Sequence, residues 1–423
     1  MRTLLADTSP LTESADFRRL WFGQLLSILG NQLTLTAVSL QVYDLTHSSF
    51  NVGLLGLVAL VPLIAAGLYG GSIVDAHDRR TVAIASSLLL WGTSALIALQ
   101  AWLRLDSVGL IYVLVALQAL GAGINMPARS SIIPRLIRPE LLAAANALNM
   151  ITFGLGGAVG PLLAGTLVVG VGYGWTYTLD VLSFTVAMWA LLRLPPLPPE
   201  GAVRRAGLRS VAEGFQFLGT RPNIRMTFLI DLSAMVFAMP RSLLPAVAAL
   251  SLGGGAATAG ALLGAIAAGT FLGGLFSGPV GRLRWQGRGV QTAVVAWAAS
   301  ILGFGLVVLG AGRSSPDGPT WWLLPAVLCM IAAGAADSVS AALRSTILQA
   351  ATPDAMRGRL QGVFTVVVAG GPRLGDVFSG GMASWIGEGA AVVVGAFACA
   401  ALVVVLHFAQ PRFARYDALD PSP

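Results

Sequence analysis

The chain has 423 residues, of which 56% are hydrophobic and only 11% are charged, and its net charge at pH 7 is +7. A water-soluble protein of this length needs more polar side chains to cover its surface, so the composition excludes an ordinary soluble domain. All 26 basic residues are arginines, and they are scattered over short segments instead of forming one patch. This scatter argues against a nucleic-acid-binding protein.

Apolar segments of membrane-spanning length recur along the whole chain. The hydrocarbon core of a bilayer is about 30 Å thick, and a helix needs about 20 mostly apolar residues to cross it. Because helices satisfy their own backbone hydrogen bonds in lipid, we predict an all-α membrane protein. The first segment is too long for the apolar region of a cleaved signal peptide. Twelve predicted transmembrane helices cover residues 20–42, 50–73, 81–103, 108–128, 144–169, 174–194, 224–248, 256–280, 289–311, 321–343, 361–386 and 389–408.

The arginines are distributed unequally between the two sides of these predicted helices. The chain ends and every second connection together carry 22 arginines, whereas the other connections carry two, Arg104 and Arg313. Short cytoplasmic loops of membrane proteins are enriched in basic residues. We therefore expect both termini in the cytoplasm and the protein in the cytoplasmic (inner) membrane of a bacterium.

The longest connection, residues 195–223, divides the chain into two predicted six-helix bundles, 1–194 and 224–423. It begins with a proline-rich run and continues into an amphipathic stretch typical of a helix that lies on the membrane surface. The bundles carry a repeat, because the segment that starts at Arg129 resembles the segment that starts at Arg344, 215 residues later. A parallel repeat of this kind predicts a cleft between the halves near the membrane midplane.

The loop after the second predicted helix reads GGSIVDAHDRR and resembles the G-x-x-x-D-R-x-G-R-R signature of the major facilitator superfamily of secondary transporters. The matching residues are Gly71, Asp75, Arg79 and Arg80. The resemblance implies a cytoplasmic gate in which this loop meets the start of the eleventh helix, near Arg357 and Arg359. Ala76 and Asp78 depart from the signature. The alternative is a simple arginine-bearing loop without a gating role.

The fifth predicted helix contains GLGGAVGPLLAG, which resembles the G-x-x-x-G-P-x-x-x-G signature of exporters and antiporters in this superfamily. The residues of the motif are Gly156, Gly160, Pro161 and Gly165. Glycines one turn apart form a groove for a neighbouring helix, and a proline inside a helix removes one backbone hydrogen bond. Generic close packing of helices is the alternative.

Three further stretches resemble the enterobactin (siderophore) exporter branch of the superfamily. They are LQVYDLTHSSFNVGLLGL from Leu40, PARSSIIPRLIRPELLAAANAL from Pro127 and DLSAMVFAMPRSLLPAVA from Asp231. The branch resemblance implies export of a siderophore or a similar small secondary metabolite by alternating access. A multidrug or antibiotic efflux pump of the same superfamily is the alternative.

Helices 1, 4, 7 and 10 line the central cleft in this superfamily. The resemblance therefore implies a set of polar residues that face the cargo, namely Asn31, Gln32, Gln118, Asn125 and Arg241. A charge inside the membrane is costly and is a functional candidate by default. We predict proton coupling at a buried carboxylate, with Asp231 as the first candidate and Asp180 and Asp376 after it.

The alternatives for these carboxylates are structural. Asp231 and Arg241 are ten residues apart in the predicted seventh helix and do not share a face of it, so a pair between them is not expected. Asp231 instead pairs permanently with another residue in the alternative interpretation. Asp376 lies three residues after Arg373, close enough for the two charges to neutralise each other. Asp337 is expected to pair with Arg344.

Enzymatic functions find little support in the sequence. A lysine-containing phosphate-binding loop is impossible without lysine, and the three histidines, His47, His77 and His407, stand in separate segments. We expect no metal, no cofactor and no nucleic-acid partner. A polytopic membrane enzyme and a passive channel are the less favoured classes. The expected partners are small-molecule cargo, protons and the lipid bilayer, and we expect a monomer.

Overall fold

The computed structural model describes residues 7–198, 208–275, 283–313, 315, 317–352 and 354–418. Contacts between Cα atoms divide the chain into two compact units. The first unit comprises Met1–Gln41 and Val58–Gly207, and the second comprises Val42–Leu57 and Leu208–Pro423. The sequence placed residues 42–57 in the first bundle, but glycines bring this segment against α13 of the second unit. A Cβ atom at Gly53 would lie 2.3 Å from the carbonyl oxygen of Asp376.

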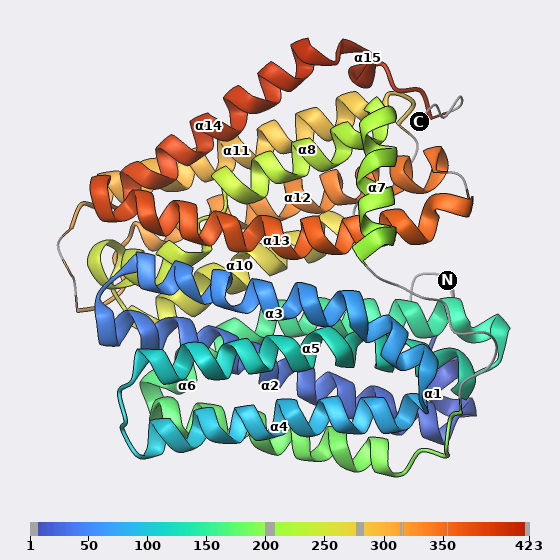
Figure 1. The fold of residues 1–423 in the computed structure, drawn as a ribbon. Helices are drawn as coiled ribbons and strands as arrows, with labels where there is room; N and C mark the ends of the chain where they lie inside the picture. The colour runs from blue at the N-terminus through green and yellow to red at the C-terminus, as the bar shows by residue number, and fades with distance from the viewer. Residues whose placement is uncertain are drawn as a thin grey trace. The chain divides into compact units, whose positions relative to one another are not determined.

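The first unit is built from long helices joined by short turns (Figure 1). Its elements are α1 (Ser9–Glu13), α2 (Ala15–Thr46), α3 (Ser49–Ala76), α4 (Arg79–Trp102), α5 (Val108–Leu136), η1 (Pro139–Leu141) and α6 (Leu142–Leu192). Residues 42–57 at the α2–α3 turn are counted with the second unit. Gly172 interrupts α6 with φ 81° and ψ 173°, a conformation that glycine adopts without a steric penalty. This break separates the fifth and sixth predicted helices.

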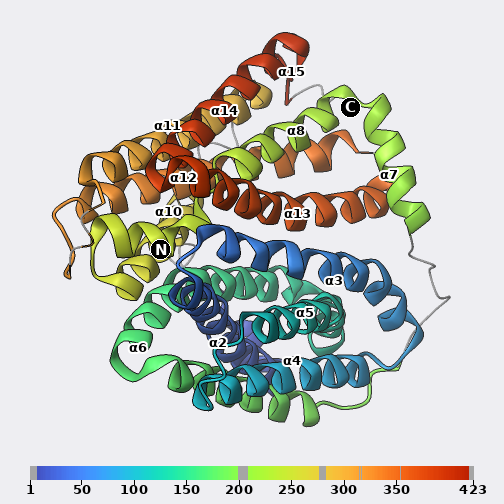
Figure 2. The same ribbon diagram turned by 60° about the vertical axis from the view of Figure 1, so that its left-hand side comes forward.

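The second unit begins with α7 (Leu208–Thr220), which packs against α13 and is visible in two views (Figures 1 and 2). This short helix falls in the predicted linker, where the sequence is amphipathic. The elements that follow are α8 (Pro222–Phe237), η2 (Arg241–Leu243), α9 (Leu244–Val247), η3 (Ala248–Leu252), α10 (Gly255–Leu275), α11 (Gln286–Ala311), α12 (Leu323–Ala351), α13 (Asp354–Ile386), α14 (Glu388–Ala409) and α15 (Pro411–Ala414).

The seventh predicted helix is not continuous, which corrects the sequence interpretation. The α-helix ends at Phe237, and Ala238 leaves the helical region with φ −116° and ψ 26°. Pro240 has no backbone N–H to donate, so a regular helix does not continue through it. Asp231 therefore lies in α8, whereas Arg241 begins the separate 3₁₀ turn η2.

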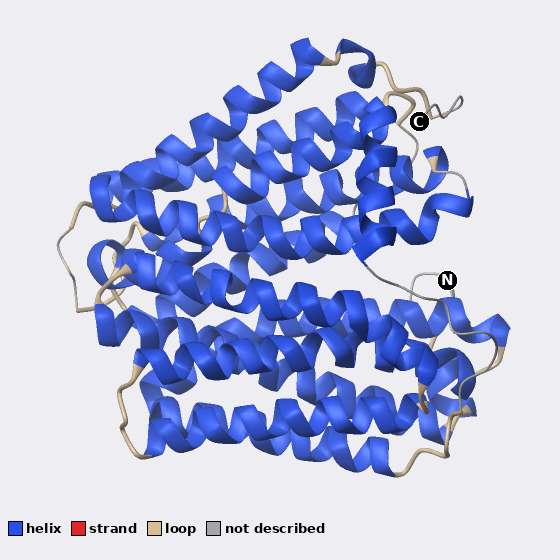
Figure 3. Ribbon diagram, viewed as in Figure 1, coloured by secondary structure: helices blue, strands red, loops and turns tan. Residues whose placement is uncertain are grey.

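Helices are the only regular elements assigned in the described residues (Figure 3), and the predicted all-α class is confirmed. Ten described segments are long and apolar enough to cross a membrane, and one of them, Pro139–Leu192, contains the break at Gly172. α13 is 33 residues long and carries Arg373 and Asp376 in its interior. The predicted number of twelve is reached only when α6 is counted as two helices and α13, which is not among these ten segments, is added.

Glycines allow these helices to pack with their backbones close together. A Cβ atom at Gly334 on α12 would lie 1.9 Å from the carbonyl oxygen of Ile266 on α10, and one at Gly269 on α10 would lie 2.0 Å from that of Ile331 on α12. Real Cβ atoms do not approach a carbonyl oxygen so closely, so any larger residue would push the helices apart. Small residues of this kind drive helix association in lipid, where burial of apolar surface contributes little.

Candidate transport site

The glycine motif of α6 lies against α2 in the first unit. A Cβ atom at Gly156 would lie 2.4 Å from Cγ2 of Ile28, and one at Gly160 would lie 2.4 Å from Cβ of Gln32. Two further residues of the motif are buried in the same helix, Pro161 and Gly165. The stem of Gln32, a predicted cleft residue, therefore packs on the glycine groove, and Asn31 beside it is half-buried.

Asp78, which departs from the family signature in the predicted gate loop, caps α4. Its Oδ1 accepts a hydrogen bond from the backbone N–H of Thr81 at 3.0 Å, and its Oδ2 accepts one from the N–H of Leu197 at 2.7 Å. Aspartate directly before a helix start is a strong N-cap, and this signal was available in the sequence. Asp78 thus stands where the signature has a glycine, and it both caps α4 and accepts a hydrogen bond from the segment after α6.

The two arginines of the same loop bind backbone carbonyl groups within the first unit. Arg79 donates from Nη1 to the carbonyl oxygen of Ser131 on α5 at 3.2 Å, and Arg80 donates from Nη2 to that of Leu192 on α6 at 2.8 Å. Cations near the last carbonyl groups of a helix complement its dipole. The side chains of the remaining predicted gate residues lie outside the described part of the structure, namely Gly71, Asp75, Arg357 and Arg359.

Two predicted cleft residues use their amides between α4 and α5. Asn125 donates from Nδ2 to Oγ of Ser87 at 2.8 Å and to Oγ of Ser86 at 2.9 Å. Gln118 donates from Nε2 to Oγ of Ser94 at 3.3 Å. Both amide side chains are buried. The structure therefore places these groups in the polar contact of two neighbouring helices of the first unit.

Asp180 lies on the second part of α6, fully buried inside the first unit. Its Oδ2 accepts hydrogen bonds from Oγ1 of Thr34 on α2 at 2.7 Å and from Oγ of Ser94 on α4 at 2.8 Å. Ser183 donates to its Oδ1 at 3.5 Å. Because Ser94 also accepts from Gln118, the carboxyl group joins a network of four helices. Hydroxyl groups, not a cation, are the partners that the described residues provide.

Among the arginines that the sequence assigned to cytoplasmic loops, Arg129 and Arg344 lie inside helices and are largely buried. The predicted fourth and tenth helices end at residues 128 and 343, but α5 continues to Leu136 and α12 to Ala351. Arg129 is only 7% exposed and donates from Nη2 to Oγ of Ser87 at 3.3 Å. Arg344 is also largely buried. A helix end predicted from hydropathy is placed at the first charged residue. The helix itself can continue past that residue where neighbouring helices bury its side chain.

Arg344 joins two carboxylates of the second unit, and we call Asp231, Asp337 and Arg344 the acidic cluster. Arg344 forms an ion pair with Asp231 of α8 through Nη1, and its Nη2 lies 3.7 Å from Oδ1 of Asp337 on α12. The Asp231 side chain is 8% exposed, whereas that of Asp337 is 32% exposed. One guanidinium thus faces two carboxylates, which leaves a net charge of −1. Sequence reasoning anticipated the contact with Asp337 and missed the contact with Asp231.

The acidic cluster borders a cavity of about 210 Å³ within the second unit. α8, α12 and α13 form its walls. Besides the charged residues, the lining consists of Thr227, Phe228, Met235, Ala341, Ser345, Leu348, Val368 and Pro372. A partly apolar cavity beside a few convergent polar groups is the usual form of a small-molecule or ion site.

A second group of charges lies where η2 meets α13, and we call Arg241, Arg373 and Asp376 the cationic cluster. Arg241 and Arg373 both interact electrostatically with Asp376. Asp376 is 8% exposed, and its buried Oδ1 has no hydrogen-bond partner among the described residues. Arg241 is exposed. These three side chains together carry a net charge of +1, because two guanidinium groups accompany one carboxylate.

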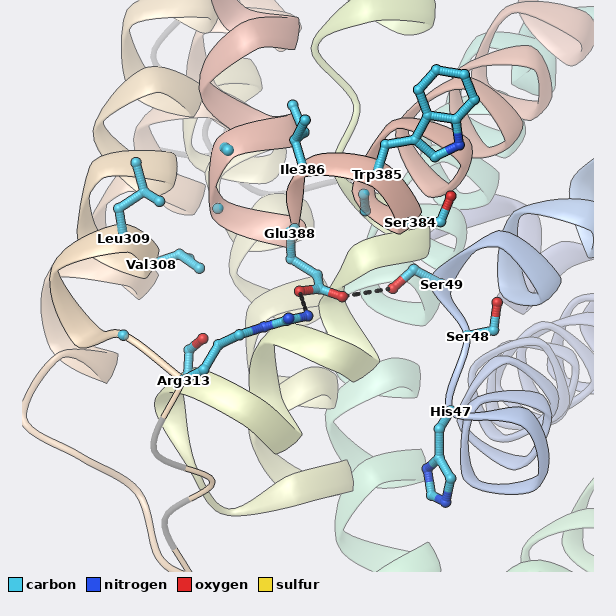
Figure 4. A pocket seen from close by; sticks show the side chains of 16 residues that line it. His47, Ser48, Ser49, Val308, Leu309, Arg313, Ser384, Trp385, Ile386 and Glu388 are labelled. Carbon is cyan, nitrogen blue, oxygen red and sulfur yellow. Dashed lines mark hydrogen bonds and ion pairs between the residues drawn. The ribbon is translucent and has the colours of Figure 1, made fainter.

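A larger cavity of about 590 Å³ lies at another end of the second unit, where α14 begins (Figure 4). Glu388 in the first turn of α14 accepts a hydrogen bond from Nη2 of Arg313 at 2.6 Å and one from Oγ of Ser49 at 3.4 Å. His47 and Trp385 also line the cavity. Arg313 was counted among the loop arginines, and Ser49 and Glu388 were not singled out by the sequence.

The described residues contain no group of three or more His, Cys, Asp or Glu side chains placed to hold a metal ion. His407 has a different contact, because its Nδ1 lies 3.0 Å from Oε1 of Gln291. Cys329 and Cys399 are free thiols.

Known proteins match the chain along almost its whole length. The family described as transmembrane secretion effector matches residues 6–423. The enterobactin exporter EntS of Citrobacter koseri is 29% identical over 423 residues, which cover 99% of this chain and 97% of that protein. EntS of Escherichia coli strain K12 is 29% identical over 421 residues and covers 96% of each chain.

Solved structures show the same fold at low sequence identity. A bacterial homologue of the iron transporter ferroportin has a TM-score of 0.69 and 14% identity, and the match covers 95% of this chain and 98% of that one. A POT family transporter in complex with 5-aminolevulinic acid has a TM-score of 0.71 and 12% identity, covering 95% and 97%. The helical architecture, the repeat and the family match agree, and the chain belongs to the transmembrane secretion effector family of major facilitator superfamily transporters.

Proposed function

We propose that this protein exports a siderophore or a similar small secondary metabolite across the cytoplasmic membrane of a bacterium. The observation that carries the proposal is the similarity to enterobactin exporters, which extends over 99% of the chain and 97% of the relative. A likeness of this extent covers both predicted six-helix bundles. As a secondary transporter, the protein moves its cargo and catalyses no chemical reaction.

Alternating access is the proposed mechanism. Residues 1–194 and 224–423 act as the two moving halves, and residues 195–223 connect them on the cytoplasmic side. The distribution of 22 arginines against two supports this orientation, with both termini in the cytoplasm. We propose that the monomer is the transporting unit, because each chain supplies both halves.

Proton movement in the opposite direction drives the export in this proposal. The acidic cluster supports it best, because two carboxylates share the single guanidinium of Arg344 beside a cavity. Uptake of one proton neutralises the excess charge and releases one carboxylate from its ion pair, so the packing of α8 on α12 responds to the proton. Asp180 is completely enclosed, and Asp376 interacts electrostatically with two arginines, so both are weaker candidates than Asp231.

Transport into inside-out membrane vesicles tests this function. Vesicles with an acidic lumen and this protein should accumulate radiolabelled enterobactin, whereas vesicles without the protein or with an uncoupler should not. Accumulation that is unchanged by the uncoupler would refute proton coupling but would still support export. Accumulation of a cationic dye but not of the siderophore would replace the proposal with multidrug efflux.

A further inference from the structure

The second unit contains two charged clusters of opposite sign. The acidic cluster joins two carboxylates to one guanidinium, and the cationic cluster joins two guanidinium groups to one carboxylate. Arg241 and Asp231 lie on the same membrane-spanning segment, Pro222–Leu252, on opposite sides of the break between α8 and η2. An unbalanced charge inside such a segment is costly and is retained where it serves a function. The proposed proton cycle uses the acidic cluster and leaves the cationic cluster without a role.

Tight backbone contacts hold the cationic cluster in place. Ser242, next to Arg241, donates from Oγ to the carbonyl oxygen of Asp376 at 2.9 Å and lies 3.0 Å from Oγ of Ser379. A Cβ atom at Gly375 would lie 2.1 Å from the carbonyl oxygen of Met235, so α8 and α13 touch through their backbones. Arg241 and Arg373 therefore belong to backbone segments that are in direct contact, and a binding site for a defined chemical group requires such support.

The side chains of the cationic cluster do not satisfy all of one another's polar groups. Asp376 is more than nine-tenths buried, and its Oδ1 has no hydrogen-bond partner in the described part of the chain. Arg241 is exposed, and its interactions with Arg373 and Asp376 are electrostatic. A guanidinium offers donors in a planar fork that matches an anionic pair of oxygen atoms. The cluster thus has an accessible cation and an excess positive charge of one.

We propose that the cationic cluster binds an acidic group of the exported cargo, a carboxylate or another anionic oxygen pair. This inference rests on the proposed export function and adds the chemical class of the cargo. Arg241 is the contacting residue, and Arg373 adds the second positive charge. Asp376 is a positioning residue, because its negative charge attracts the two guanidinium groups and competes electrostatically with an incoming anion.

Binding of salicylate and its neutral amide, salicylamide, to the purified full-length protein tests the site. The two probes have nearly the same size and differ in one charge. The protein should bind salicylate at least tenfold more tightly than salicylamide, as measured by titration in lipid nanodiscs. Arg241→Gln should remove this preference, and Arg241→Lys should retain part of it. Arg288→Gln, which removes an exposed arginine elsewhere in the second unit, is the matched control and should change neither affinity.

The decisive variant is Asp376→Asn. It should raise the affinity for salicylate, because it removes the carboxylate that competes with salicylate for the arginines. A purely structural role of Asp376 would instead lower the affinity for both probes equally. Equal binding of the two probes by the unmodified protein, or no binding of salicylate, overturns the proposed anion site. Siderophore accumulation in vesicles with the same preparation separates this failure from failure of the export function, since export persists if only the anion site is wrong.

Discussion

The two copies of the repeat place an arginine at the same point of equivalent helices and surround it differently. α5 and α12 both have 29 residues, and Arg129 and Arg344 occupy matching positions 215 residues apart. Arg344 is balanced by Asp231 and Asp337, whereas Arg129 donates to the hydroxyl group of Ser87, and its Nε is buried without a partner among the described residues.

The same difference separates the buried carboxylates of the two units. Asp180 in the first unit is held by hydroxyl groups of Thr34 and Ser94, whereas Asp231 in the second unit is held by a cation. A hydroxyl group satisfies a carboxyl group in either protonation state, but an ion pair changes its energy when the carboxylate takes up a proton. The two repeated helices thus share their length and the position of the arginine, whereas among these buried groups the arginine–carboxylate pair lies in the second unit.

The largest effect is expected from Arg344→Gln, which leaves two partly buried carboxylates without their shared cation. Breaking a buried ion pair in this way costs about 3–5 kcal/mol. We expect a large drop in the thermal unfolding temperature of the detergent-solubilised protein and loss of vesicle transport. The double variant Arg344→Gln with Asp231→Asn should recover much of the stability. No recovery would mean that Arg344 acts through packing instead of charge.

Asp231→Asn should abolish gradient-driven transport while expression and folding remain intact. Asparagine keeps the shape of the side chain but cannot carry the proton, and Arg344 retains Asp337 as its partner. Siderophore accumulation in acid-loaded vesicles is the measurement, with the elution profile on size-exclusion chromatography as the folding control. Full transport by this variant would remove Asp231 from the proton pathway.

Asp180→Asn should have a smaller effect, because the amide oxygen still accepts from Thr34 and Ser94. Replacing a charge-assisted hydrogen bond by a neutral one lowers the free energy of unfolding by about 1 kcal/mol. Transport should persist with a slightly lower unfolding temperature. Complete loss of transport by a folded Asp180→Asn protein would transfer the proton-carrying role to the first unit and reverse the comparison.

Arg129→Gln should have the smallest effect, in contrast to Arg344→Gln. The side chain is buried and has no carboxylate partner in the described residues, so its removal relieves a desolvation cost. We expect an unfolding temperature equal to or above that of the unmodified protein.

A grafted acid sharpens this contrast. Ala122 lies 215 residues before Asp337, and both positions are half-buried. Ala122→Asp should therefore couple favourably to Arg129 by about 0.5 kcal/mol or more in a double-mutant cycle with Arg129→Gln. A coupling of zero would show that the two arginines point into different surroundings despite the shared helix register.

Most of the helical architecture could be predicted from residue order, and most of the charge pairing could not. Apolar length located the spans, and the glycine spacing in the fifth helix anticipated a close helix contact, which the structure places between Gly160 and α2. Pro240 was a visible signal for the break, but the apolar residues around it led to the prediction of a continuous helix. Asp231 and Arg344, in contrast, come from helices far apart in the chain, and no local pattern selects that pairing.

The sequence by itself determined the class of protein, the repeat and the family resemblance. These properties depend on hydropathy and residue spacing. Both are local, because each segment in lipid must satisfy its backbone hydrogen bonds within itself. Only the tertiary structure decided that Arg129 and Arg344 are buried within helices, that Asp231 shares an arginine with Asp337, and that Ser242, next to Arg241, contacts Asp376. A buried charge takes the partner that helix packing brings within a few ångströms, and that partner is set by the fold as a whole.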